Sequence, residues 1–396
     1  TTRIYAPNGV TVDEDKNVYF ADTNNRRIRF IPRTDGTYFG QTMLANYIYT
    51  IAGDGTSGYN SDAIAATAAQ ISDATGVSVD KSGNVYIADY GNHRLRFVPK
   101  TGGSYFGQTM TANNIYTIAG NGTGAYGGDG GLATSAQIRN PYGSAVDAEG
   151  NVYVADTTNQ RIRLIPKTSG TYFGQAMTAN FIYTIAGNGT GAFGGDGGAA
   201  TSAQIWNPTN VSVDGGGNIY IAGNSSPRIR FVPKKNGTYF GQSRTANYIY
   251  TIGGNGGTTY DGENGSAAGK NISKPEGVYV GPDHMLYLTD YNNKIRMIAG
   301  EDFIAPSTST VTATAGSVAG KIDLSWASAG DDMVNLGNLT GAYRIQYATY
   351  TATWSTGSTP ANATTLTIAT TSVVPGVVQS TSISGLSSGT TYYFAL

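Results

Sequence analysis

The chain has 396 residues, which is enough for two or three domains, each with a hydrophobic core of its own. It contains 55 Gly and 28 Tyr, and only 13% of its residues are charged, a composition that favours an all-β protein with many turns. A net charge of -1 excludes a general electrostatic attraction to nucleic acid or to an anionic membrane. Cysteine is absent, which excludes disulfides and thiolate metal sites, and no apolar stretch is long enough for a membrane-spanning helix.

The tripeptide Asn-Val-Tyr at residues 17–19 returns every 67 residues in the same or a closely related form. The later copies lie at residues 84–86, 151–153, 218–220 and 285–287. Residues 168–205 are almost a copy of residues 101–138. A fixed period of this size indicates five copies of one structural unit.

Each repeat predicts four antiparallel strands, because it contains short alternating runs bounded by Gly, Asn, Asp and Pro. In the second repeat these runs are residues 76–80, 84–89, 94–98 and 115–120, and a longer excursion passes through residues 105–108 before the last of them. Four strands per repeat without helical periodicity predict the blades of a β-propeller. A solenoid would need fewer strands per unit.

Three strings recur in order along the repeats: Gly-Val-x-Val-Asp, then Gly-Asn-Val-Tyr-x-Ala-Asp, then Asn-x-Arg-Ile-Arg. Over roughly residues 1–300 this succession resembles the NHL repeat. The resemblance implies an NHL-type β-propeller, most often of six blades in that family, which usually acts as a binding platform through loops on one face. We therefore predict an all-β propeller domain over residues 1–302, with five visible blades and room for a sixth in the intact protein.

Both ends of this domain break the pattern. Residues 1–7 align with residues 202–208, which follow the fourth strand of a repeat, so a strand is expected just before Thr1. The fifth repeat continues past Met297 without a fourth strand. A segment before Thr1 would supply the missing strand and close the ring, or would add a sixth blade.

A second domain, a β-sandwich, is predicted for residues 303–396. Apolar side chains alternate along residues 322–326 and 343–347, and Tyr392 has the spacing of a tyrosine corner, so this region resembles a fibronectin type III domain that stops inside its sixth strand. The unpaired strand edges of such a domain, and of the fifth blade, are templates for strand addition. If Thr1 and Leu396 are the true ends, self-assembly by strand exchange is expected; otherwise the missing strands belong to the same polypeptide.

An acid closes the second strand of four repeats, and a basic residue follows four or five positions later. The pairs are Asp22 with Arg27, Asp89 with Arg94, Asp156 with Arg161, and Asp290 with Lys294. We predict structural ion pairs that pin the hairpin between the second and third strands, with a ligand site around these acids as the alternative. In the fourth repeat Gly223 replaces the acid and Arg228 loses its partner, by drift or as a place where an outside carboxylate binds.

A second acid lies in the Gly-rich connection between blades, at Asp62, Asp129, Asp196 and Glu263. One acid per loop is too few for calcium, so a tight turn with glycines at positive φ is expected. The glycines lack the Lys-Ser/Thr of a phosphate loop and open no helix, which argues against nucleotide binding.

Only two histidines occur, His93 and His284, both at turn positions. The amidating lyases and streptogramin lyase-like enzymes that share the NHL-type propeller need histidines, and these two cannot form a three-histidine metal site. We therefore expect no cofactor, no metal site and no enzyme activity. The alternative, a metal-assisted lyase or hydrolase, would have to rest on carboxylates.

The third strands are rich in arginine, and some NHL propellers bind single-stranded RNA on a basic face. Here the arginines alternate with apolar residues, as Arg94 and Arg96 do around Leu95. Their stems are expected to pack between blades with the charged heads paired to acids. We therefore predict no nucleic-acid binding.

These features favour a non-catalytic bacterial or archaeal protein, extracellular or at the cell surface, by analogy with proteins that combine NHL-like and fibronectin-like modules. The propeller would be a platform for protein partners or self-assembly, and the sandwich a spacer or assembly module. The first alternative is a carbohydrate-binding protein that uses exposed aromatic side chains of the blade-connecting loops. These are Tyr126, Phe193 and Tyr260, which share one register and would line one rim of the ring.

Overall fold

The computed structural model describes residues 3–262, 265–281 and 285–298, together with six strands of the C-terminal region. Those strands are β31 (Val311–Ala315), β32 (Ile322–Ala327), β33 (Leu339–Ala348), β34 (Thr364–Val373), β35 (Val378–Ile383) and β36 (Tyr393–Ala395). The chain divides into two compact units, residues 1–300 and 301–396, where the sequence placed the boundary after residue 302. The fold is all-β, as predicted.

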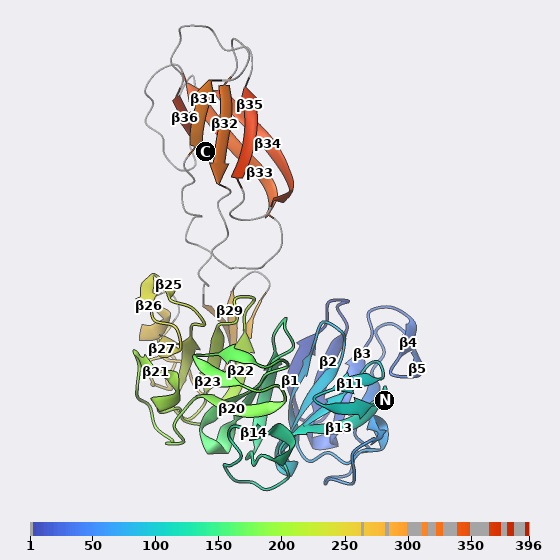
Figure 1. Ribbon diagram of the computed structural model, residues 1–396. Helices are drawn as coiled ribbons and strands as arrows, with labels where there is room; N and C mark the ends of the chain where they lie inside the picture. Colours follow the sequence, from blue (N-terminus) through green and yellow to red (C-terminus); the bar gives the residue numbers. More distant parts are fainter. Residues whose placement is uncertain are drawn as a thin grey trace. The chain divides into compact units, whose positions relative to one another are not determined.

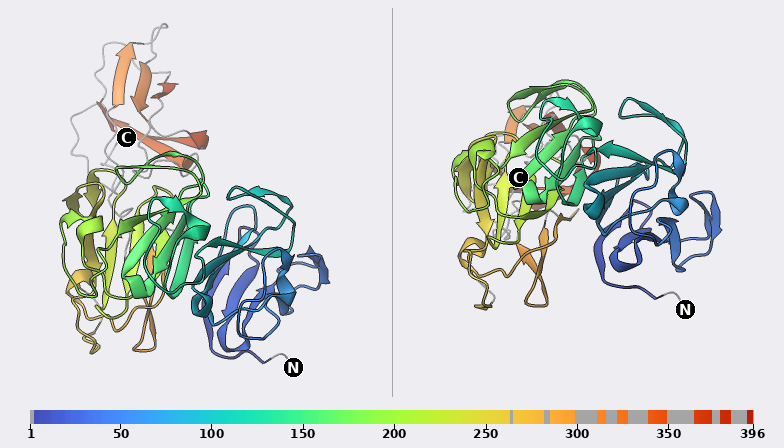
Figure 2. Two further views of the ribbon diagram at one scale, coloured as in Figure 1. Left: turned by 60° about the horizontal axis from the view of Figure 1, so that its bottom comes forward. Right: turned by 90° about the horizontal axis from the view of Figure 1, so that it is seen from below.

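The N-terminal unit is a five-bladed β-propeller (Figure 1). The first strand of each blade lies at the centre, and neighbouring first strands contact one another in chain order. These central strands are β1 (Pro7–Val12), β8 (Ala74–Val79), β15 (Pro141–Val146), β22 (Pro208–Val213) and β28 (Val278–Val280). Figure 2 shows the blades following one another around an arc, with the first (blue) and the fifth (orange) at its two ends.

The other strands of each blade add outward in antiparallel order. Second strands are β2 (Val18–Asp22), β9 (Val85–Asp89), β16 (Val152–Asp156), β23 (Ile219–Gly223) and β29 (Leu286–Asp290). Third strands are β3 (Arg27–Ile31), β10 (Arg94–Val98), β17 (Arg161–Ile165), β24 (Arg228–Val232) and β30 (Lys294–Ile298). Fourth strands are β6 (Tyr49–Ala52), β13 (Asn114–Ala119), β20 (Phe181–Ala186) and β27 (Tyr248–Gly253). The four predicted strands are confirmed in repeats one to four, and three strands of the fifth blade lie in the described residues.

Between the third and fourth strands the predicted excursion folds into a two-stranded hairpin. The hairpins are β4 (Gly36–Tyr38) with β5 (Gln41–Met43), β11 (Gly103–Tyr105) with β12 (Gln108–Met110), β18 (Gly170–Tyr172) with β19 (Gln175–Met177), and β25 (Gly237–Tyr239) with β26 (Gln242–Arg244). Single-turn 3-10 helices η1 (Thr23–Asn25), η3 (Tyr90–Asn92) and η5 (Thr157–Asn159) join second to third strands. Each hairpin returns aromatic rings to its blade: in the second blade, Tyr105 and Phe106 lie 5.3 and 5.4 Å from the ring of Phe97.

The connection between blades contains a short strand that the sequence did not predict. It pairs with the fourth strand of the following blade, at the outer edge of the sheet, before the chain enters the centre. These edge strands are β7 (Ile64–Ala65), β14 (Gly131–Leu132) and β21 (Gly198–Ala199), and the 3-10 turns η2 (Ala66–Ala68), η4 (Ala133–Ser135) and η6 (Ala200–Ser202) follow them, with η7 (Ala267–Gly269) in the equivalent place of the fifth repeat. Each turn also binds the preceding blade, because the Gly120 amide donates to the Ala133 carbonyl. Two neighbouring blades are therefore joined at the rim as well as at the centre.

The core lies between blades, where two different faces meet. One face carries the aromatic and leucine side chains of a blade, such as Leu95 and Phe97, and both are fully buried. The other face belongs to the next blade and carries β-branched residues, here Val152, Val154 and Ile165. Burial of this apolar surface is the main stabilising contribution to the fold.

At the centre of the propeller, glycines let the first strands of neighbouring blades approach closely. A Cβ atom on Gly76 would lie 2.6 Å from the Tyr142 carbonyl oxygen and 3.0 Å from the Cα of Gly143. Gly9 faces the strand of Gly76 in the same way. Close packing of the central strands therefore explains the glycine of the repeated Gly-Val pair, because a larger residue would push the blades apart.

We expect Gly76→Ala to lower the free energy of unfolding by about 1–3 kcal/mol, because a methyl group must be forced between two central strands. Gly269→Ala is the matched control, since nothing lies within 4 Å of the Cβ it would add. Chemical denaturation followed by tryptophan fluorescence measures both. Equal stability of the two variants would contradict the close central packing.

The six strands of the C-terminal unit form two three-stranded antiparallel sheets, in the orders β31-β32-β35 and β34-β33-β36. The predicted corner residue Tyr392 lies outside the described residues. In the part of the chain that the structure describes, no helix has the length and apolar character needed to cross a membrane.

Candidate functional site

The acid that closes the second strand is a buried acceptor for several donors. In the second blade Asp89 accepts hydrogen bonds from the Ser72 amide at 2.8 Å, from the Asn92 side chain at 2.9 Å and from Arg96 at 3.3 Å. Asp89 and Arg96 are both fully buried. The same ion pair is made by Asp22 with Arg29 at 2.8 Å, by Asp156 with Arg163 at 3.2 Å and by Asp290 with Arg296 at 3.1 Å.

The predicted partners of these acids were wrong by two residues. Arg94 stands directly opposite Asp89 in the strand ladder, but its guanidinium donates to the carbonyls of Asn92 and Asn121 instead. Both Arg94 and Arg96 point to the same side of the strand, so alternation cannot distinguish them. The diagonal position suits a long side chain that must turn back to a carboxylate, and it is Arg96 that does so. The residues displaced from the predicted pairs in this way are Arg27, Arg94, Arg161 and Lys294.

In the second, third and fourth blades the arginine at this position also binds the acid of the connection between blades. Arg163 binds Asp129 at 2.7 Å in addition to Asp156, and so bridges two carboxylates. Arg96 with Asp62 at 2.9 Å and Arg230 with Asp196 at 2.6 Å repeat the contact. The glycines beside Asp129, Gly128 and Gly130, have φ of +74° and +73°, the turn geometry that the sequence predicted.

The fourth blade keeps the arginine but lacks the first acid. Arg230 binds Asp196 and takes the carbonyls of Gly194 and Gln204 as further acceptors. Arg228, the predicted carboxylate site, donates to the Ser226 hydroxyl at 2.8 Å and to the Asn255 carbonyl at 2.7 Å. Among the described residues it has no carboxylate partner, and these two bonds use two of its five N–H donors.

The predicted aromatic residues stack on the basic side chains that make no ion pair with the acids at the ends of the second strands. The Arg161 guanidinium lies 3.7 Å from the ring centre of Tyr126, and Arg228 lies 3.7 Å from that of Phe193. Lys294 lies over Tyr260 at 4.5 Å. The loop aromatics therefore stabilise the rim through cation–π contacts while one part of each ring stays exposed.

Tyr59 belongs to the same series, although it was not among the predicted aromatic residues. Its ring lies 3.8 Å from the Arg94 guanidinium. The signal was present, because Tyr59 precedes Tyr126 by one repeat length.

The acids of the first and second blades differ in pKa although they have the same kinds of partner. Burial alone would raise the pKa of Asp22, but hydrogen bonds from the Tyr5 amide and Arg29 outweigh it and lower the pKa. For Asp89 burial outweighs the opposing effect of Arg96 and raises the pKa to about 6. The second blade is covered on both faces and the first on one, which accounts for the stronger effect of burial at Asp89.

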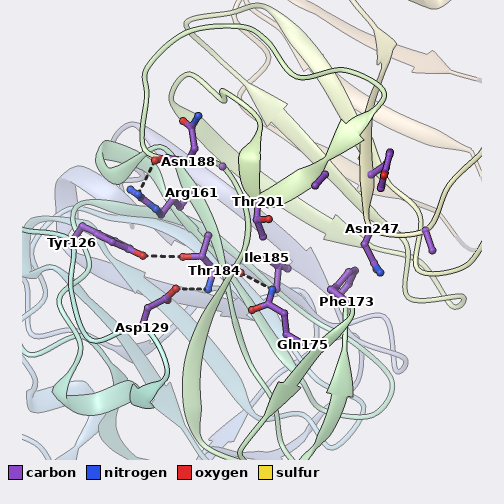
Figure 3. Close-up of a pocket in the computed structure, with 14 residues that line it drawn as sticks. Tyr126, Asp129, Arg161, Phe173, Gln175, Thr184, Ile185, Asn188, Thr201 and Asn247 are labelled. Carbon is purple, nitrogen blue, oxygen red and sulfur yellow. Dashed lines mark hydrogen bonds between the residues drawn. The ribbon is translucent and has the colours of Figure 1, made fainter.

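A cavity of about 550 Å³ opens between the outer parts of the third and fourth blades (Figure 3). Thr184 of β20 is central to its floor: its amide donates to Asp129, its carbonyl accepts from Gln175, and its hydroxyl lies 3.5 Å from the Tyr126 hydroxyl. Arg161 and Tyr126 form one side. The fourth blade contributes Thr201, Asn247 and Tyr248 from the other side.

In the described residues, no group of three or more His, Asp or Glu side chains is placed to hold a metal ion. His93 ends the η3 turn with φ of +54°, and its Nδ1 accepts a hydrogen bond from the Asn140 amide at 3.2 Å. Burial and nearby arginines lower its pKa, which favours the neutral acceptor form. His284 and Glu263 lie outside the described residues.

Comparison with known proteins supports the repeat. The sequence signature of the NHL repeat matches residues 72–96, within the second blade. The chain is 27% identical over 171 residues to Protein SUPPRESSOR OF QUENCHING 1, chloroplastic, from Arabidopsis thaliana, and 33% identical over 104 residues to Teneurin-1 from Homo sapiens. These matches cover 43% and 24% of this chain, but only 15% and 4% of the relatives.

Solved structures to which this chain is similar include two groups of enzymes. Virginiamycin B lyase from Staphylococcus aureus is 14% identical, with a TM-score of 0.38 over 82% of this chain and 78% of that one. The gluconolactonase XC5397 from Xanthomonas campestris is 11% identical, with a TM-score of 0.39 over 80% of this chain and 82% of that one. The lyase and gluconolactonase activities are those of the two enzymes named.

We expect Asp156→Ala to lower the free energy of unfolding by about 3–5 kcal/mol, because it leaves the fully buried Arg163 short of a charge partner. Asp129→Ala removes the other partner of the same arginine from a more exposed position, so its cost should be about 1 kcal/mol. Denaturant titration of both variants is the measurement. Equal losses would show that burial does not govern the strength of the bridge.

The fourth blade allows the converse experiment. Gly223→Asp should restore the second carboxylate for Arg230 and raise the free energy of unfolding by about 1 kcal/mol. The new Cβ would lie 3.3 Å from the Ser226 carbonyl oxygen, a tight contact that requires a small shift of the neighbouring backbone. A lower melting temperature would mean that the carbonyl acceptors of this blade already satisfy Arg230.

Proposed function

We propose that this chain is a non-catalytic binding protein, extracellular or at the cell surface, in which the propeller is an interaction platform. The observation that carries the proposal is that the two end blades leave apolar faces uncovered that are buried everywhere else in the propeller. Exposed apolar sheet faces of this kind mark contact sites with other polypeptides.

The fifth blade exposes its aromatic-and-leucine face. Ile295 and Met297 are 79% and 56% exposed, whereas Leu95 and Phe97 at the same positions of the second blade are fully buried. Tyr279 of β28 lies on the same face and is also exposed. The opposite face of this blade is buried against the fourth blade.

The first blade exposes the other kind of face. Val10 and Val12 of β1 are 65% and 51% exposed, whereas Val77 of β8 is buried. The two uncovered faces are therefore of complementary types. Since every internal interface joins one face of each type, the occupant that fits both is a further blade of the same repeat.

The state of the charged groups supports a role without catalysis. In the second and third blades both acids and the bridging arginine are used up in ion pairs. A general acid or base needs a carboxylate or imidazole that can approach a substrate. A metal-assisted lyase or hydrolase would have to draw its ligands from elsewhere.

The strand order of the C-terminal unit supports the proposal that it is a fibronectin type III-like module. The first, second and fifth strands form one sheet, and the fourth, third and sixth form the other, as in the sandwich of that family. Its proposed role is that of a spacer or assembly module beside the propeller. The proposed location follows from this pairing of modules, and detection of the native protein on intact cells by antibody would test it.

The chain should self-associate through its end faces, and a charged face should prevent this. We expect the wild type to show concentration-dependent association in analytical ultracentrifugation, and the Ile295→Asp/Met297→Asp variant to stay monomeric with an unchanged circular dichroism spectrum. The control is Leu132→Asp, which places one negative charge at another exposed apolar side chain, on the rim. Association that survives in the double variant would rule out the fifth-blade face, and a monomeric wild type would contradict the proposal.

Carbohydrate binding is the second candidate. It is favoured by the cavity beside Tyr126, which combines aromatic rings with polar side chains.

A further inference from the structure

We propose that the cavity between the third and fourth blades binds an acidic saccharide, a sugar ring that carries one carboxylate. This inference rests on the proposed role of the propeller as a binding platform and names the ligand class for one site on it. The volume of about 550 Å³ is in the range of small-molecule sites and is sufficient for one or two sugar rings.

The carboxylate partner would be Arg161. Its guanidinium donates to the carbonyls of Asn159 and Asn188 and lies over Tyr126, but it makes no ion pair among the described residues. Two of its five N–H donors are used in these bonds, which leaves others for a ligand. Its charge is uncompensated, in contrast to Arg163, which is bound by two carboxylates.

Because Arg161 is the cation available in this cavity, the site favours a ligand with a single negative charge. The carboxylate of Asp129 also lines the cavity, already bound to Arg163. A ligand with several phosphates would meet this acid beside one arginine, so a nucleic-acid strand is disfavoured. A carboxylate that binds an arginine through paired N–H donors fits the charge of the site.

The remaining lining suits the rest of a sugar ring. Tyr126 and Tyr248 present exposed aromatic surface from the two sides, against which the apolar face of a pyranose can pack. The Asn247 side-chain oxygen is buried without a hydrogen-bond donor among the described residues, as is that of Asn113 two repeats earlier. The side chains of Thr201 and Asn247 both line the cavity and can form hydrogen bonds with sugar hydroxyl groups.

The experiment compares two arginines with the same structural role. Arg94 stacks on Tyr59 and donates to two carbonyls as Arg161 does, but it does not line this cavity. The full chain is titrated by calorimetry with galacturonic acid, glucuronic acid and N-acetylneuraminic acid, and with their methyl esters. Binding of at least one free acid is expected, and its methyl ester should bind about ten-fold or more weakly.

Arg161→Gln should weaken that binding about ten-fold or more, and Arg94→Gln should leave it unchanged. Absence of binding to all three acids would overturn the inference, as would equal affinity for acid and ester. An equal loss in the two variants would also overturn it, because the effect would then be structural. None of these outcomes bears on self-association through the end blades, which the double aspartate variant tests separately.

Discussion

A buried ion pair of an arginine is the contact on which each blade depends, and in the second and third blades this arginine binds two carboxylates. Arg96 reaches the acid at the end of the second strand and the acid of the incoming connection, so one guanidinium ties three segments together. A fully buried guanidinium is costly unless its donors are satisfied, and here the cost is offset only when both strands and the connection are in place. The network therefore favours one arrangement of blade and connection over other compact packings of the same apolar strands.

This arrangement determines the chemistry that remains available at the rim. Because Arg163 takes both acids, its neighbour Arg161 is left with carbonyl acceptors and an aromatic ring. The rim then carries a row of stacked cations whose charge is not cancelled locally. Arg161 has the same kinds of structural contact as Arg94 of the second blade, but it also lines the cavity between the third and fourth blades and can therefore bind a ligand there.

The sequence predicted the parts of this structure that depend on local pattern. The period of 67 residues and the turn residues gave the four strands, and the glycines around Asp129 gave the positive φ turn. Two predictions required information that the pattern lacks. Arg94 and Arg96 share a side of the strand, so only side-chain length and the diagonal geometry decide which one meets Asp89. The edge strand β14 has two residues, which is too short for alternation to indicate.

The cavity could not have been predicted, because it joins segments far apart in the chain. Tyr126 comes from a blade connection, Thr184 from a fourth strand, and Tyr248 from the next blade. The 67-residue period shows which residues occupy equivalent positions in different repeats. It does not show which residues of neighbouring blades lie close together in space. Tyr126 and Arg161 were placed in different classes by the sequence, one as a binding residue and one as half of an ion pair.

The uncovered end faces follow from the same logic of repeats. An internal blade is stable because each of its two faces meets a face of the other type, and the chain repeats this interface four times between five blades. A row of such blades always ends in one face of each type, whatever its length, unless the two ends meet. In this chain the end faces carry apolar residues where solvent would permit polar ones: Ile295 and Met297 on one face, and Val10 and Val12 on the other. A sequence that had adapted these faces to water would carry polar residues there, as capping repeats do. Their apolar character is consistent with the proposed role of both faces as contact sites for protein.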